Sequence, residues 1–233
     1  LHLLCAGHLE DGRKALADGF TSAGLALPAA SVRGRLAALW RRGRMAVRGL
    51  QWRERPASEV PRAALARVDL LRAAAVGALV VDPGGAFDVQ AQHLLLSLET
   101  GEPTRIGRAI ALEAILAAQL GPAGRHRFLA MLAEARALAK RLGDRETADL
   151  VELVLLVDAA HSGDFAAVLA RAEALATTAD LALPHARNLV HGYRLLALLQ
   201  LGRLPLLAER LPPRLHAADE HDESDQTLGR HGQ

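Results

Sequence analysis

The sequence predicts an all-α protein, a tetratricopeptide-like helical-repeat solenoid of antiparallel helix pairs. At four places an apolar segment runs into a glycine and a second helical pattern follows, namely at Gly7, Gly101, Gly163 and Gly202. A glycine at such a junction is typical of the end of one helix and the start of its partner. Hydrophobic residues make up 51% of the 233 residues but aromatic residues only 3%, so the core must consist largely of Ala and Leu, which favour helices over sheets.

Glycine and proline divide the amino-terminal half of the chain into helical segments. The expected order is a short helix ending at Gly7, helices over 9–23 and 31–48, a polar loop over 49–60, and helices over 61–81 and 87–98. Ser31 is a residue type that caps a helix, and Pro61 fits a first helical position because its missing N–H is not needed there. The segment Asp82-Pro83-Gly84-Gly85 is expected to end the helix before it.

The carboxyl-terminal half continues the pattern, and brings the total to about ten helices. Helices are expected over 104–120, 125–142, 144–161, 164–179, 185–201 and 204–211. Asp144 and Asp164 are expected to cap the helices that they open, and Gly163 to end a helix with a positive φ. Residues 150–157 are apolar on every side apart from Glu152, so this helix is expected at the buried centre of the stack.

Two regions of different composition are expected. Residues 1–211 form one helical-repeat domain, and residues 212–233 form a disordered acidic tail because the run Asp219-Glu220-His221-Asp222-Glu223-Ser224-Asp225 has nothing to bury. The chain opens on Leu1, without a basic segment ahead of an apolar one. We therefore expect no signal peptide, and we interpret the chain as a piece of a longer polypeptide.

Cysteine content and hydropathy point to a cytoplasmic protein without a membrane span. Cys5 is the single cysteine, which excludes an internal disulfide. The longest stretch without a charged residue is 19–32, which is 14 residues and shorter than the roughly 18 to 20 apolar residues that a span requires. Neither observation identifies a binding partner.

Motifs for nucleotide chemistry are absent from the sequence. A phosphate-binding loop places its lysine after glycine, whereas Lys14 follows Arg13 and Lys140 follows Ala139. The glycine-rich loop, the His-Arg-Asp and the Asp-Phe-Gly signatures of protein kinases are missing as well. We expect this chain to be no enzyme, with no catalytic residue and no cofactor-binding residue.

Metal-ligand patterns are equally weak. His185 and His191 are six positions apart, which places them on different faces of a helix. His221 lies among tail carboxylates without fixed geometry. Asp149 and Glu152 share a helix face as a pair of catalytic carboxylates would, but a polar edge on a buried helix is the favoured interpretation. We expect no metal site.

Arginine is concentrated in one short region. Eight arginines and one acid, Glu54, lie between positions 33 and 55, although the whole chain carries a net charge of only +2. Four of them fall within an arc of about 80° on a helix, and these are Arg33, Arg41, Arg44 and Arg48. The apolar residues of the same helix, Leu36, Leu39, Trp40 and Val47, are expected to anchor its other side. The arginine stripe is the candidate partner-binding site, for an acidic protein surface or for nucleic acid, with a merely solvated face as the alternative.

A family resemblance covers roughly residues 36–120. It is carried by the segments Trp40-Arg41-Arg42, Val47-Arg48-Gly49-Leu50-Gln51-Trp52-Arg53-Glu54-Arg55-Pro56, Glu59-Val60-Pro61, Arg67-Val68-Asp69 and Gln90-Ala91-Gln92-His93-Leu94-Leu95-Leu96-Ser97-Leu98-Glu99-Thr100-Gly101-Glu102-Pro103. These segments resemble the tetratricopeptide-like helical region that follows the predicted AAA-type ATPase module in large bacterial serine/threonine protein kinases. The resemblance weakens to a generic helical-repeat match through about residue 211.

The resemblance implies a sensor or scaffold part of a signalling kinase, whose kinase and ATPase modules lie upstream of this chain. No catalytic residue of that family maps onto it. The partner is then a protein or the upstream modules of the same polypeptide. A free-standing helical adaptor for a protein or peptide, and a transcription-regulator module that binds nucleic acid, remain the alternatives.

Overall fold

The computed structural model describes residues 8–25, 32–177 and 186–211. Within them it contains ten α-helices, two short 3₁₀ helices and no strand, which confirms the all-α prediction. The elements are α2 (Leu9–Ala23), α3 (Val32–Arg48), η1 (Ala57–Glu59), α4 (Arg62–Val81), α5 (Pro83–Thr100), α6 (Pro103–Ala118), η2 (Gly121–Gly124), α7 (Arg125–Leu142), α8 (Arg145–His161), α9 (Phe165–Thr177), α10 (Ala186–Gln200) and α11 (Leu204–Arg210). The expected helix ending at Gly7, the Ser31 cap and the 212–233 tail lie outside the described residues.

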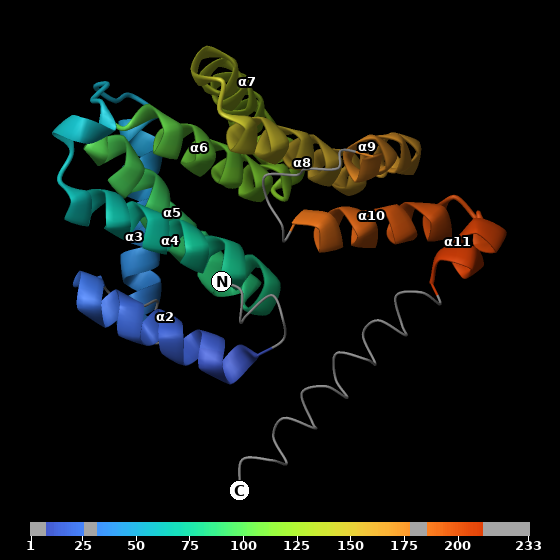
Figure 1. Cartoon of the computed structure of the whole chain (residues 1–233), viewed down its shortest axis with the longest axis horizontal. Coiled ribbons are helices and arrows are strands. Elements are labelled where there is room, and N and C mark those ends of the chain that lie inside the picture. Colours follow the sequence, from blue (N-terminus) through green and yellow to red (C-terminus); the bar gives the residue numbers. More distant parts are fainter. Residues whose placement is uncertain (1–7, 26–31, 178–185, 212–233) are drawn as a thin grey trace, which may run out of the picture.

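The helices pack mainly against their neighbours in the chain, as a helical-repeat fold requires. Pairs with extensive contact are α4 with α5, α6 with α7, and α9 with α10. The even-numbered helices α2, α4, α6, α8 and α10 also contact one another in succession, so they form a continuous layer. Figure 1 shows the helices advancing from α2 to α5 at one end of the molecule to α9–α11 at the other.

Helix α6 is the centre of the packing. It contacts α4, α5, α7 and α8, and thirteen of its 16 residues are buried. The expected burial of residues 150–157 in α8 is confirmed for Leu150, Val151, Leu153, Val154, Leu156 and Val157. Helix α8 lies between neighbours as expected, since it contacts α6, α7, α9 and α10. Helix α6 shares this central position and is buried at more positions.

Helix ends follow the predicted glycines and aspartates. Gly101, Gly163 and Gly202 have φ values of 77°, 75° and 67°, in the left-handed region that glycine adopts without strain. After Gly163, the Asp164 carboxylate accepts a hydrogen bond from the Ala167 N–H at 3.0 Å. The prediction of a glycine stop followed by an aspartate cap is therefore confirmed.

One predicted boundary was wrong. Helix α4 ends at Val81 as predicted, but the next helix begins at Pro83 and not at Phe87. The Asp82 carboxylate accepts from the Gly85 N–H at 3.0 Å, and Pro83 occupies the first helical turn. Aspartate as cap and proline inside the first turn are a start signal. In the described part of the chain, no helix is both long and apolar enough to cross a membrane.

Candidate functional site

Helix α3 exposes the apolar face that the sequence analysis expected to be buried. Leu36, Leu39, Trp40 and Val47 are 61%, 69%, 74% and 91% exposed. Among the α3 side chains that the structure describes, only Met45 is buried, at 2% exposure. The prediction that the apolar side anchors this helix is wrong.

Three of the four predicted partner-binding arginines contact α5 within the chain. Arg41 makes a two-pronged ion pair with Asp88, with N–O distances of 2.6 and 2.7 Å. Arg44 donates to Glu99 at 2.8 Å, and Arg48 donates to the Leu95 carbonyl oxygen at 3.4 Å. The fourth, Arg33, is exposed. The stripe is therefore largely occupied by the chain's own acidic and carbonyl groups.

Arg42, which lies outside the predicted stripe, makes the most buried of these ion pairs. Its Nη1 donates to Glu113 of α6 at 2.5 Å, and its guanidinium also bonds the Phe87 carbonyl oxygen and lies 5.3 Å from the centre of the Phe87 ring. Glu113 is 2% exposed, and Arg127 approaches the same carboxylate oxygen at 3.4 Å. Burial raises the pKa of Glu113 although both arginines oppose this effect.

The orientation of α3 has an electrostatic cause. The helix contains no acidic residue, whereas α5 and α6 present three carboxylates to it, those of Asp88, Glu99 and Glu113. Charge-assisted pairs of arginine with carboxylate are the strong hydrogen bonds of proteins. A lone charge inside α6, such as that of Glu113, was the one sequence signal that could have indicated a buried cationic partner.

The face of α3 that remains outward is apolar. Leu39, Leu36, Val47 and Trp40 fall within an arc of about 100° at helical spacing, and Gly43 lies between them. We call these four large side chains the α3 stripe. Monomeric proteins seldom leave a contiguous apolar patch of more than a few hundred Å² uncovered unless it is functional.

A recess adjoins the stripe at Leu39. A cavity of about 320 Å³ lies between α3, α5, α6 and the start of α7. Its apolar lining includes Ala38, Leu39, Phe87, Leu116, Ala117 and Leu120. Arg42, Glu113 and Arg127 lie on its charged side. Since Leu120 is itself 55% exposed, the apolar surface continues from α3 across the recess to the end of α6.

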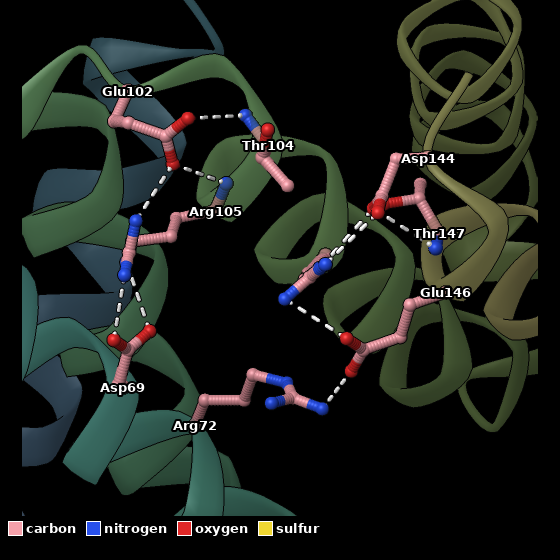
Figure 2. Close-up of polar contacts among 9 residues, drawn as sticks. Asp69, Arg72, Glu102, Thr104, Arg105, Asp144, Glu146 and Thr147 are labelled. Carbon is pink, nitrogen blue, oxygen red and sulfur yellow. Dashed lines mark hydrogen bonds and ion pairs between the residues drawn. The ribbon is translucent and has the colours of Figure 1, made fainter. Parts of the chain in front are cut away.

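A second group of charges has a structural role. In Figure 2, the side chains of Arg105 and Asp69 join α6 to α4, and Arg72 of α4 pairs with Glu146 of α8. Arg108 of α6 pairs with Asp144 at 2.9 Å and with Glu146 at 2.8 Å. Burial favours the neutral form of Asp144, but hydrogen bonds from Arg108 and Thr147 outweigh it and lower the pKa. These residues tie three helices of the even-numbered layer together.

Among the described residues, the most buried histidine is a core residue. His93 is fully buried, and its Nδ1 lies 3.0 Å from the Gln90 Oε1. Burial, helped by the positive charge of Arg72, lowers the pKa of His93 to about 3. The ring is therefore neutral at physiological pH and out of reach of solvent.

The weaker catalytic and metal-binding candidates are not brought together. Glu152 pairs with Arg171 at 3.3 Å on the surface, in agreement with the interpretation of a polar edge. His185 and His221 lie outside the described residues. Among the described residues, no group of three His, Cys, Asp or Glu side chains could hold a metal ion.

Comparisons with protein-family models, with curated protein sequences and with solved structures found no match to this chain.

Proposed function

We propose that this chain is a non-catalytic helical-repeat scaffold of the cytoplasm that binds a protein partner through the α3 stripe. The observation that carries the proposal is the exposure of Leu36, Leu39, Trp40 and Val47, at 61% to 91%, on a helix whose opposite side is held by ion pairs. Burying one such side chain against a partner contributes about 1.5 to 3 kcal/mol. Tryptophan is also among the residues that most often dominate the energy of protein interfaces.

The position of the α3 stripe along the chain supports a role in a signalling protein. It lies within residues 36–120, the segment that resembles the helical region of bacterial serine/threonine protein kinases with an AAA-type ATPase module. We propose that the chain is the sensor or scaffold region of such a protein. Kinase and Walker motifs in the open reading frame upstream of Leu1 would support this context, and a start codon with a promoter there would favour a free-standing adaptor.

The nucleic-acid alternative has less support. Phosphate binding requires available cations, and Arg41, Arg44 and Arg48 already contact α5. We also propose that the isolated chain is catalytically silent. Incubation with labelled ATP and a generic acceptor protein tests this, and turnover that survives repurification would contradict it.

Site-specific cross-linking tests the proposed binding surface. A photoreactive phenylalanine analogue replaces Trp40 in one variant and Leu129 in a control variant, because Leu129 is also exposed, at 49%, but lies on α7. The proposal expects one protein to cross-link from position 40 and not from position 129. The same protein, purified, should bind the unmodified chain and bind the Trp40→Ser variant about tenfold more weakly or worse.

Equal cross-linking from both positions, or undiminished binding of the Trp40→Ser variant, would overturn the assignment of this surface.

A further inference from the structure

We infer that the partner contacts α3 through an amphipathic helix that has acidic edges and one large apolar anchor side chain. The inference rests on the proposed function and specifies the chemistry of the partner. A long apolar stripe beside a recess is the kind of surface that takes a helix, with anchor residues at positions i, i+3, i+4 and i+7.

Both edges of the α3 stripe are positively charged. Arg33 borders the stripe on the side of Trp40, and Arg35 borders it on the side of Leu39. Both arginines are exposed, and neither has an ion-pair partner in the described part of the chain. Because α3 contains no acidic residue, a helix with Glu or Asp along both edges of its apolar face complements this surface.

A second copy of this chain does not fit the same surface. If two α3 stripes faced each other, Arg33 and Arg35 of each copy would lie among the arginines of the other. Like charges placed opposite one another across an interface weaken association. Nucleic acid would satisfy the arginines, but it would leave Leu36, Leu39 and Val47 uncovered.

The recess beside Leu39 specifies the anchor. Its surface is mostly apolar, with the Phe87 ring on one side, and its volume of about 320 Å³ is open at Leu39 and Leu120. Each charge in its lining is paired, Glu113 with Arg42 and Arg127, and Asp88 with Arg41. The recess therefore takes an uncharged side chain of the size of Leu or Phe.

Trp40 provides a direct optical test. The chain contains two tryptophans, so a Trp52→Phe background leaves Trp40 as the only tryptophan reporter of the stripe. The probes are three designed helical peptides of the length of α3, 17 residues. One carries a leucine face with Glu edges, one the same face with Lys edges, and one the Glu-edged sequence with a central proline that breaks the helix.

The inference expects the Glu-edged peptide to shift the Trp40 emission to shorter wavelength and to bind at least about tenfold more tightly than the Lys-edged peptide. Its affinity should fall as salt is added. The proline peptide should leave the emission unchanged. Equal binding of the two helical peptides, or binding of the Lys-edged peptide alone, would overturn the inference.

Charge reversal supplies the matched controls. The Arg33→Glu/Arg35→Glu variant should reverse the preference between the two helical peptides, whereas Arg203→Glu, an exposed position between α10 and α11, should leave it unchanged. Leu120→Ser should weaken binding of the Glu-edged peptide without changing the preference for acidic edges over basic ones. An Arg203→Glu effect as large as that of the double variant would mean that only net charge is sensed, which also overturns the inference.

These results can be separated from the test of the proposed function. If position 40 cross-links a protein partner that rebinds, but the Lys-edged peptide binds as well as the Glu-edged one, then the function stands and the acidic helix is refuted. If position 40 captures no partner and no peptide shifts the emission, both fail. A shift caused by duplex DNA and by none of the peptides refutes both as well.

Discussion

Replacing Arg42 by methionine is expected to lower the free energy of unfolding by about 2 to 3 kcal/mol at neutral pH. The variant keeps an unbranched apolar stem but removes the cation 2.5 Å from Glu113. Breaking a fully buried pair costs about 3 to 5 kcal/mol. We expect less here because Arg127 remains 3.4 Å from the same carboxylate and the Arg42 side chain is 24% exposed.

The loss should depend on pH in a defined direction. Burial raises the pKa of Glu113, and Arg42 is the largest opposing influence, so its removal raises this pKa further. An acid whose pKa is higher in the folded than in the unfolded state binds its proton more tightly when folded. Stability linked to Glu113 is therefore present at low pH and lost as the pH rises through the folded pKa. The difference between variant and wild type should shrink from about pH 7 to about pH 5.

Urea unfolding followed by circular dichroism at both pH values measures these effects. The double variant Arg42→Met/Glu113→Leu should recover most of the lost stability, since it leaves no buried charge unpaired. Arg44→Met serves as the control. It breaks a pair whose side chains are 54% and 45% exposed, and exposed pairs contribute about 1 kcal/mol or less.

The explanation fails if Arg42→Met stays within about 0.5 kcal/mol of wild type at neutral pH, or if the double variant is less stable than the single one.

Three further predictions test the fold. Met45→Ala should lower the free energy of unfolding by about 2 to 5 kcal/mol, since Met45 is 2% exposed. Trp40→Ser should change it by less than about 0.5 kcal/mol. Equal losses for the two variants in urea unfolding would contradict the orientation of α3 described above. Because His93 has a lowered pKa of about 3, its contribution to stability is present above the unfolded pKa of about 6.5 and is lost as the pH falls toward 3. In the His93→Gln variant, the free energy of unfolding should therefore fall less steeply with decreasing pH over this range. Gly163→Val should lower the thermal midpoint through a strain of about 1 to 2 kcal/mol, and an unchanged midpoint would contradict its φ of 75°.

The sequence alone determined the helices and most of their ends. The expected helix over 125–142 coincides with α7, and the stop at Gly163 with the cap at Asp164 is found as predicted. These features depend on backbone groups within one turn of the residue concerned, so neighbours in the chain suffice to predict them. Where two local signals competed, as at Asp82-Pro83-Gly84-Gly85, the helix end at Val81 was predicted correctly, but the start of the next helix was not, because aspartate and proline outweighed the glycines.

The tertiary structure alone decided which face of α3 is buried. Helix α3 has two candidate faces, one apolar and one basic, and helical periodicity cannot rank them because both repeat at the same spacing. Asp88 and Glu113 decide which face is buried, and they lie 47 and 71 positions along the chain from their arginines. A buried carboxylate without a cation is costly, so packing α5 and α6 together forced the basic side of α3 inward. The apolar side, which sequence reasoning assigned to the core, was left at the surface as the candidate site.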